Sequence, residues 1–215
     1  MKTERVLIAD DHAIVRAGLR TIIRDIRPFA HFDEAANGKD VIELVKNNHH
    51  DMIILDIIMP ETDPIEMLRN VFALRENSRV LIYSMKSEDL YANRFLQLGV
   101  LGYLNKESPP EEIKKAITNV VNGNMYISPN LKKHLYEDVL AKRTDNPFER
   151  LSNRELQIAT YLLKGYSHAE IKAALNLHSS TVGTLRIRLF EKLKIKNLVE
   201  LGELAKLYQI DFSGL

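Results

Sequence analysis

Short apolar runs alternate with amphipathic stretches in the N-terminal part of this chain. Each apolar run has the length of a strand that is buried on both faces of a parallel sheet. The segments between the runs carry apolar residues at helical spacing, so five strand–helix units follow one another. This pattern predicts an α/β fold, a five-stranded parallel sheet wound with helices on both faces. The predicted strands are residues 5–10, 30–35, 51–56, 79–84 and 100–104.

Two helix starts are marked by proline and acidic residues. Asp63, Pro64 and Glu66 supply an N-cap, a proline at the first helical position and an acid at the third. Ser108 and Pro109 open a second segment of the same kind. We therefore expect one helix to begin at Pro64 and another at Pro109.

The pattern changes after Gly123, and no strand-like run follows. Residues 126–148 predict a linker that is partly helical over 131–140. Residues 149–215 predict a small all-α domain of four short helices, and residues 1–125 form the α/β domain. The predicted helices of the second domain begin near Ser152 and Ser167, each with a capping box, near Ser180, and near Asn197.

Composition adds few constraints. The chain has 215 residues, a formal net charge of +1 and no cysteine, so disulfides and cysteine-ligated metals are excluded. No apolar run approaches the roughly 20 residues needed to span a bilayer, and the N-terminus does not resemble a signal peptide. We expect a soluble, cytoplasmic protein that does not bind membranes.

Acidic residues follow two of the predicted strands. Asp10 and Asp11 end the first strand and Asp56 ends the third, while Ser84 ends the fourth and Lys106 follows the fifth. The carboxyl ends of parallel strands share one edge of a sheet, where ligands bind. Converging carboxylates need a cation, and oxygen ligands suit Mg²⁺. Two acids would then hold the metal while the third attacks phosphorus, and the lysine and the serine would contact phosphoryl oxygens.

These residues, together with two dipeptides, resemble the receiver domain of bacterial two-component response regulators. The resemblance covers residues 1 to about 122 and implies the flavodoxin/CheY-like form of the doubly wound fold. It also implies that a histidine kinase is the phosphate donor. The dipeptides are Met59-Pro60 and Gly102-Tyr103.

The receiver resemblance assigns a role to each strand-end residue. Asp56 would accept the phosphate, and Lys106 would bind it. Ser84 and Tyr103 would form a switch pair, in which the hydroxyl turns toward the phosphate and the ring packs inward behind it. The implied Mg²⁺ ligands are the side chains of Asp10, Asp11 and Asp56 and the main-chain carbonyl of Ile58.

Some positions near the predicted pocket depart from the receiver pattern or could suggest other chemistry. Pro64 stands where receivers usually carry glycine, and proline cannot take positive φ. We therefore expect the loop after Asp56 to be stiffer or differently routed. His12 is expected to be a surface residue at a helix start, and His49 and His50 are expected in a solvated loop, since no third metal ligand lies at useful spacing.

The C-terminal domain resembles the LuxR/FixJ-type (NarL-like) helix-turn-helix output domain from about residue 149 to 208. The resemblance implies sequence-specific binding to double-stranded DNA through the helix that begins near Ser180. It also implies that the last helix, over residues 197–208, pairs two output domains on DNA. The segments that carry the resemblance are residues 151–156, 163–171 and 175–182.

The predicted recognition helix has an apolar stripe on one side. The stripe consists of Val182, Leu185, Leu189 and Leu193. On the outward side, Gly183 replaces the lysine typical of the family, so the face is short of positive charge. The basic residues that remain could bind phosphates, or they could merely solvate the helix end and favour its macrodipole. The candidate DNA contacts are Thr181, Thr184, Arg186, Ile187, Arg188 and Lys192.

The sequence as a whole predicts a response regulator that regulates transcription and forms a homodimer when phosphorylated. It would not be an enzyme beyond slow self-catalysed phosphorylation and dephosphorylation. One alternative is a phosphorylation-dependent protein-interaction switch with weak or no DNA binding. A phosphatase-like enzyme would also use an aspartate nucleophile with Mg²⁺, but the chain offers no acid/base partner at a useful offset from Asp56 and no cap domain.

Overall fold

The structure, a computed structural model, describes residues 4–140 and 146–210. The chain divides into two units, Met1–Tyr136 and Glu137–Leu215. Each unit is described by itself.

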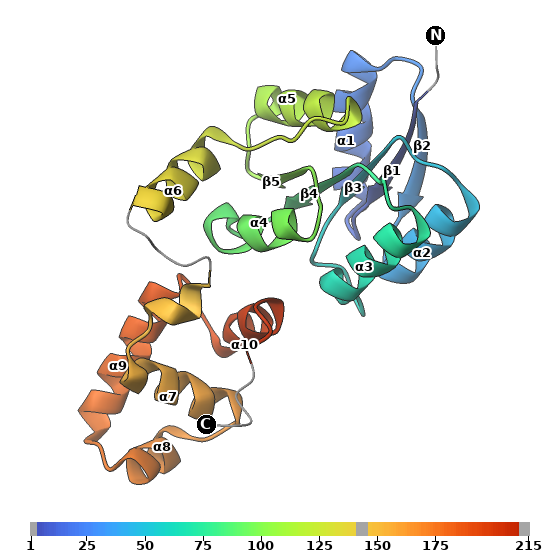
Figure 1. Cartoon of the computed structure of the whole chain (residues 1–215). Coiled ribbons are helices and arrows are strands. Elements are labelled where there is room, and N and C mark those ends of the chain that lie inside the picture. Colours follow the sequence, from blue (N-terminus) through green and yellow to red (C-terminus); the bar gives the residue numbers. More distant parts are fainter. Residues whose placement is uncertain (1–3, 141–145, 211–215) are drawn as a thin grey trace. The chain divides into compact units, whose positions relative to one another are not determined.

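The first unit is built on a five-stranded parallel sheet with strand order β2-β1-β3-β4-β5 (Figure 1). The predicted fold class is confirmed, and the strand ends differ from the predicted ones by only one or two residues. The strands are β1 (Arg5–Ala9), β2 (His31–Ala35), β3 (Met52–Leu55), β4 (Val80–Ser84) and β5 (Gly102–Asn105).

Helices cover both faces of this sheet (Figure 1). Side chains alternate along each strand, so Ile8 and Ile54 face α1 and α5, while Leu7 and Ile53 point to the face opposite and are equally buried. The strands therefore read as continuous apolar runs because neither face meets water. The helices of this unit are α1 (Ala13–Ile26), α2 (Gly38–Asn47), α3 (Pro64–Leu74), α4 (Glu88–Gln97), α5 (Pro110–Val121) and α6 (Pro129–Leu140).

One of the two predicted helix starts is confirmed and the other is wrong by one residue. Asp63 caps α3 by accepting from the backbone N–H groups of Ile65 and Glu66. In α5 the N-cap is Pro109 rather than Ser108, and the helix begins at Pro110. A residue that precedes proline is disfavoured in the helical region. Pro110 therefore keeps its neighbour extended and delays the helix.

The loop after Asp56 contains a left-handed residue. Glu61 has φ of 52°, three residues before Pro64, which begins α3 with the negative φ that proline requires. Thr62 holds this loop: its hydroxyl donates to the Pro60 carbonyl and accepts from the Gly38 backbone N–H. The positive φ of this loop is thus at Glu61, and Pro64 is the first residue of α3.

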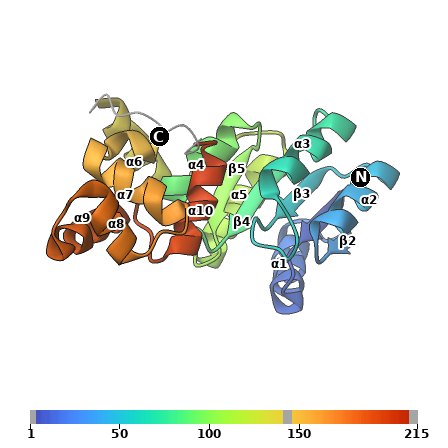
Figure 2. The same cartoon turned by 90° about the horizontal axis from the view of Figure 1, so that it is seen from below.

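The second unit is helical, as predicted, and α9 packs against α7 and α8 while α10 packs on α7 (Figure 2). Ser152 and Ser167 both form complete capping boxes, with Glu155 and Glu170. A short 3-10 helix precedes the four α-helices. The elements are η1 (Pro147–Arg150), α7 (Asn153–Leu163), α8 (His168–Leu175), α9 (Ser179–Lys192) and α10 (Leu198–Leu207).

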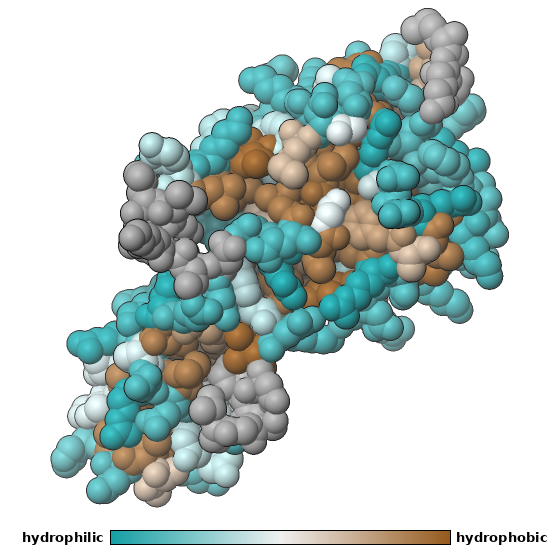
Figure 3. All heavy atoms as spheres, viewed as in Figure 1, coloured by the Kyte–Doolittle hydropathy of each residue, from teal (hydrophilic) through white to brown (hydrophobic). Residues whose placement is uncertain are grey.

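The predicted linker is helical where expected, since α6 covers residues 131–140. Residues 141–145 of that linker and residues 211–215 of the predicted output domain lie outside the described residues. Within the described chain, no helix is both long and apolar enough to cross a membrane. On the face shown in Figure 3, polar side chains surround the apolar ones that gather over the middle of the first unit.

The expectation that His50 lies in a solvated loop is wrong. Its side chain is 1% exposed, and Nε2 lies 2.7 Å from Asp33 Oδ2. Arg5 Nε donates to the same oxygen at 2.6 Å, and this hydrogen bond lowers the pKa of Asp33. Burial lowers the pKa of His50, against the opposing effect of Asp33. A proton on Nδ1 would be buried with no acceptor among the described residues, which is why the neutral ring is favoured.

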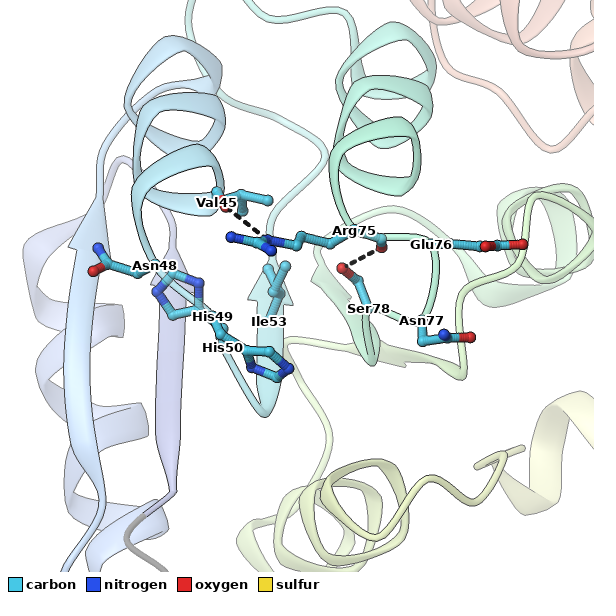
Figure 4. A pocket seen from close by; sticks show the side chains of 9 residues that line it. All are labelled: Val45, Asn48, His49, His50, Ile53, Arg75, Glu76, Asn77 and Ser78. Carbon is cyan, nitrogen blue, oxygen red and sulfur yellow. Dashed lines mark hydrogen bonds between the residues drawn. The ribbon is translucent and has the colours of Figure 1, made fainter.

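His50 also lines a hollow of about 210 Å³ between the C-terminal ends of α2 and α3 (Figure 4). There Arg75 Nε donates to the carbonyl oxygen of Val45 at 3.4 Å. Cations are favoured at helix C-termini, so this arginine joins the two helix ends. The hollow is lined by His50 and Ile53 at the start of β3, whereas Asp56 follows the end of that strand.

We expect the buried imidazole to make the first unit sensitive to acid. Between pH 6.5, the ordinary pKa of histidine, and the lowered pKa of His50, only the unfolded chain binds the proton. The free energy of unfolding should therefore fall as the pH falls through this window. NMR titration of the histidines and urea unfolding at several pH values measure both effects. His50→Gln should flatten the dependence, whereas His49→Gln, at the exposed neighbour, should leave it; equal slopes in both variants would contradict this account.

Candidate functional site

Three strand ends bring their charged residues together at one edge of the sheet. Asp10 follows β1, Asp56 follows β3 and Lys106 follows β5. Lys106 Nζ lies 2.6 Å from Oδ2 of Asp10 and 2.6 Å from Oδ2 of Asp56. The two acidic side chains are each 2% exposed, and the lysine side chain is 10% exposed. The predicted convergence of these residues is therefore present as a buried ion-pair triad.

The charge on Lys106 is maintained by its partners. Burial opposes the ammonium ion, but the interactions with Asp10 and Asp56 outweigh it and raise the pKa of Lys106. Asp56 Oδ1, the oxygen that does not face the lysine, accepts the backbone N–H of Ile58 at 3.0 Å. Both oxygens of Asp56 are thus oriented by hydrogen-bond donors, which fixes the carboxylate at the strand end.

Asp11 completes the acidic edge beside Asp10. Its Oδ1 atom is buried, and none of the described residues directs a hydrogen-bond donor at it, although His12 Nδ1 lies 2.7 Å away. Ligand atoms of Asp10, Asp11 and His12 all lie within 4.8 Å of one another. A buried oxygen without a donor, next to further carboxylates, fits a hard cation such as Mg²⁺. His12 itself is exposed and is the N-cap residue of α1, as expected.

The two residues of the predicted switch pair both bond to the backbone of Lys86, one at its N–H and the other at its carbonyl oxygen. Ser84 and Tyr103 are fully buried. Tyr103 Oη donates to the carbonyl oxygen of Lys86 at 3.0 Å, and Ser84 Oγ accepts the backbone N–H of Lys86 at 3.4 Å. Burial raises the pKa of Tyr103 well above its usual value, so the phenol keeps its proton and remains a donor. The ring lies inward, in the position that the resemblance implies.

Sequence reasoning missed one residue of the acidic edge, Arg16. Its Nη1 donates to the carbonyl oxygen of Asp10 at 2.6 Å, and its Nε donates to Glu34 at 2.7 Å. The arginine therefore fixes the main chain at the end of β1, since it bonds the carbonyl oxygen of Asp10 and not the carboxylate of that residue. An arginine one turn into α1 gave no signal of this, because its partners come from two other segments.

In the second unit, α9 has the buried and exposed sides that the stripe predicts. Val182, Leu189 and Leu193 are buried and Leu185 is partly buried. The candidate DNA contacts all lie on the exposed side, and the Ile187 side chain is 61% exposed. These exposed residues are Thr181, Thr184, Arg186, Ile187, Arg188 and Lys192.

Among these candidates, Arg186 and Lys192 have side-chain partners within the unit. The guanidinium of Arg186 lies 5.3 Å from the ring centroid of Phe190. Lys192 Nζ lies 2.7 Å from Oε2 of Glu155, whose side chain is 3% exposed. Burial opposes the negative charge of Glu155, but the lysine and the capping serine lower its pKa overall. Lys192 therefore neutralises a buried carboxylate, a role that its place in the sequence did not indicate.

Comparisons with known proteins agree with this architecture. The sequence profile of the response regulator receiver domain matches residues 6–118, and the profile of the luxR family of bacterial regulatory proteins matches residues 149–205. The chain is 34% identical to response regulator UvrY of Escherichia coli K12 over 201 residues, which are 93% of this chain and 92% of that protein. The chain belongs to the response regulators. It is a member with a luxR-type output domain, the class that regulates transcription.

Other relatives match most or part of this response regulator. Response regulator GacA of Pseudomonas aeruginosa is 34% identical over 202 residues, which are 94% of each chain. The solved structure of an RcsB–DNA complex shares the fold, with a TM-score of 0.71 over 98% of this chain and 100% of that one at 21% identity. A LuxR-family response regulator from Aurantimonas matches 65% of this chain and 99% of its own, with a TM-score of 0.60 and 29% identity.

We expect Lys106→Met to destabilise the first unit when divalent metals are absent. The change leaves two buried carboxylates without their shared cation, and breaking a buried ion pair in this way costs about 3 kcal/mol. Urea unfolding in EDTA measures the loss, and added Mg²⁺ should recover part of it.

Lys114→Met is the matched control for this prediction. Lys114 Nζ lies 3.3 Å from Asp25, whose side chain is 57% exposed, so this pair should contribute less than about 1 kcal/mol. Similar losses in the two variants would show that the triad is no stronger than a surface pair.

Proposed function

We propose that Asp56 accepts a phosphoryl group from a histidine kinase and that the luxR-type domain then binds double-stranded DNA to regulate transcription. The observation that carries this proposal is the Asp10–Lys106–Asp56 triad at the sheet edge. An oriented carboxylate beside a lysine and further acids is the arrangement that a phosphoryl acceptor needs. The proposed domains are the receiver at 1–125, the linker at 126–148 and the output domain at 149–215.

In the proposed reaction a carboxylate oxygen of Asp56 attacks phosphorus. A P–O bond forms as the P–N bond of the phosphohistidine breaks, and the histidine leaves with the bonding electrons. Lys106, now paired to the carboxylate, turns its charge to a phosphoryl oxygen, and the Ser84 hydroxyl donates to another. Mg²⁺, when bound, neutralises charge at the phosphoryl oxygens. We propose Asp10, Asp11, Asp56 and the carbonyl of Ile58 as its ligands.

The proposed conformational change begins at the peptide of Lys86. In the structure the Ser84 hydroxyl accepts the backbone N–H of Lys86. When this hydroxyl turns toward the phosphoryl group, that hydrogen bond is lost. A phosphoryl group adds up to about two negative charges and three strong acceptors, enough to reorder such a loop. Tyr103, whose ring is already buried, then lies behind the turned Ser84, and phosphorylation favours a homodimer.

DNA binding is proposed through the exposed side of α9. Arg186 and Arg188 would contact phosphates, and Thr184 and Ile187 would contact bases, since exposed methyl groups can meet the methyl group of thymine. Thr181 stands at the start of the helix, the end that enters the major groove in helix-turn-helix proteins. Lys192 is a weaker candidate, because a phosphate contact would compete with its ion pair to Glu155.

A protein-interaction switch with weak DNA binding remains the second candidate function. Gly183 lies on this face where the family typically carries lysine, and Ile187 exposes an apolar side chain. Because most affinity for DNA comes from phosphate contacts, a face short of charge favours a protein partner. A gel-shift titration with salt separates the two functions, since only DNA binding should weaken steeply as the salt concentration rises.

Asp56→Asn should abolish phosphorylation of the chain by acetyl phosphate or by a histidine kinase. The amide keeps the size of the side chain but is too weak a nucleophile to attack phosphorus. Gel mobility on a phosphate-binding matrix or intact mass spectrometry detects the label. Asp33→Asn, at an acid in the middle of β2, should leave labelling unchanged, and full labelling of Asp56→Asn would place the acceptor elsewhere.

Gly183→Lys should strengthen binding to DNA. A Cβ atom added at this position would meet no atom of another element within 4 Å, so there is open space where the lysine side chain begins. One added phosphate contact should steepen the slope of log affinity against log salt by about 0.9. Fluorescence anisotropy with a random-sequence duplex measures both quantities.

Gly183→Ala is the control that separates charge from helix stability. Alanine should stabilise α9 by up to about 1 kcal/mol relative to glycine without changing the salt slope. If both variants change DNA affinity equally, the missing lysine is not what limits binding.

A further inference from the structure

Glu88, the first residue of α4, is a buried acid to which the proposed phosphoryl transfer assigns no role. It is 8% exposed. Its Oε1 accepts the backbone N–H of Asn105 at 3.2 Å, and its Oε2 accepts a short hydrogen bond from the Ser128 hydroxyl. Burial raises the pKa of Glu88, and the two hydrogen bonds oppose that shift. A carboxyl group held in this way joins three elements, α4, β5 and the start of α6.

On one side, Glu88 is tied to the proposed switch. Asn105 is the last residue of β5 and immediately precedes Lys106. The Asn105 side chain also donates to the carbonyl oxygen of Lys86 at 3.5 Å, the same oxygen that Tyr103 contacts. The loop between β4 and α4 is thus held at Lys86 by the switch pair, and two residues later the chain enters α4 at Glu88.

On the other side, Glu88 holds the helix that leads out of the first unit. Ser128 Oγ accepts the backbone N–H of Leu131 at 3.0 Å, as an N-cap of α6 does. The Ser128 carbonyl accepts the N–H of Lys132 at 2.9 Å. Tyr126, just before this turn, donates its backbone N–H to Leu101 at the edge of the sheet. The Ser128 hydroxyl group therefore has two roles at once: it caps α6 and it donates a hydrogen bond to Glu88.

We propose that Glu88 couples the phosphoacceptor pocket to α6, so that phosphorylation of Asp56 loosens the first turn of this helix through the Glu88–Ser128 bridge. The coupling rests on the proposed function, since it needs Ser84 to release the Lys86 peptide. As the loop at Lys86 moves, it carries the start of α4 with it, and Glu88 can no longer reach both Asn105 and Ser128. The helix that enters the linker then loses its attachment to α4.

Hydrogen exchange of the full-length chain, measured by mass spectrometry over residues 131–136, tests the bridge directly. Glu88→Ala should accelerate exchange there by about tenfold, the change that corresponds to one lost hydrogen bond to a charged group. Glu88→Gln keeps an acceptor for the Asn105 N–H and presents an amide donor to the Ser128 hydroxyl, which can accept it, so exchange should stay near the wild-type rate. Glu107→Ala is the matched control, because this exposed acid lines the same surface hollow as Glu88 and Ser128.

A second pair of variants separates the bridge from the cap. Ser128→Asp keeps an N-cap acceptor but places a carboxylate against Glu88, so exchange should accelerate as in Glu88→Ala. Adding Glu88→Gln to Ser128→Asp supplies an amide donor for that carboxylate and should restore slow exchange. If Ser128→Asp alone exchanges slowly, capping is all that holds α6, and the bridge is excluded.

Coupling is tested by repeating the exchange with Mg²⁺ and beryllofluoride as a phosphoryl analogue, with ¹⁹F NMR to show that the analogue is bound. In the wild-type chain the analogue should accelerate exchange over residues 131–136. In Glu88→Ala the rate should already be high and should not rise further, although the analogue binds. An equal response in both chains would show that the signal bypasses Glu88.

The two levels of the proposal fail in different ways. If the analogue does not bind the wild-type pocket, the proposed phosphoacceptor is wrong, and the coupling falls with it. If the analogue binds but wild-type exchange over residues 131–136 does not change, the coupling alone is wrong. If Glu88→Ala without any analogue exchanges over residues 131–136 at the wild-type rate, the Glu88–Ser128 bridge does not hold α6.

Discussion

The sharing of one lysine by two buried carboxylates is the interaction on which the first unit depends. Lys106 Nζ lies 2.6 Å from both Asp10 and Asp56, and the sheet must place three strand ends within reach of a single ammonium group to achieve this. Two buried negative charges without a cation would repel each other and would be costly to desolvate. The charges of the pocket are thus balanced by one shared ammonium group.

The same edge of the sheet holds the loop between β4 and α4. Around the triad, the hydrogen bonds of Ser84 and Tyr103 meet at Lys86, one at its backbone N–H and the other at its carbonyl oxygen. Buried polar groups need their partners, so moving one of them forces the others to find new ones. Packed interiors rearrange between discrete states rather than deforming smoothly. A small rotation at Ser84 can therefore shift a whole loop.

In the second unit, one of the basic residues of α9 is used in an ion pair within the unit. Its recognition helix is short of positive charge, and one of its cations, Lys192, is engaged with the buried Glu155. The glutamate belongs to a capping box at the start of α7, so this ion pair joins the end of α9 to the start of another helix. One lysine on the exposed side of α9 therefore serves the stability of the helical unit.

The sequence by itself determined the elements, their order and the identity of the strand-end acids, because these depend on local periodicity and on residues next to one another. The capping boxes and the five strands were predictable for this reason. Tertiary structure alone decided pairings between residues far apart in the chain that no strand-end pattern indicated: Ser128 with Glu88 across 40 positions and Lys192 with Glu155 across 37. It also buried His50 against Asp33. No local pattern encodes such contacts, since each partner is chosen by the packing of elements that meet only in the folded chain.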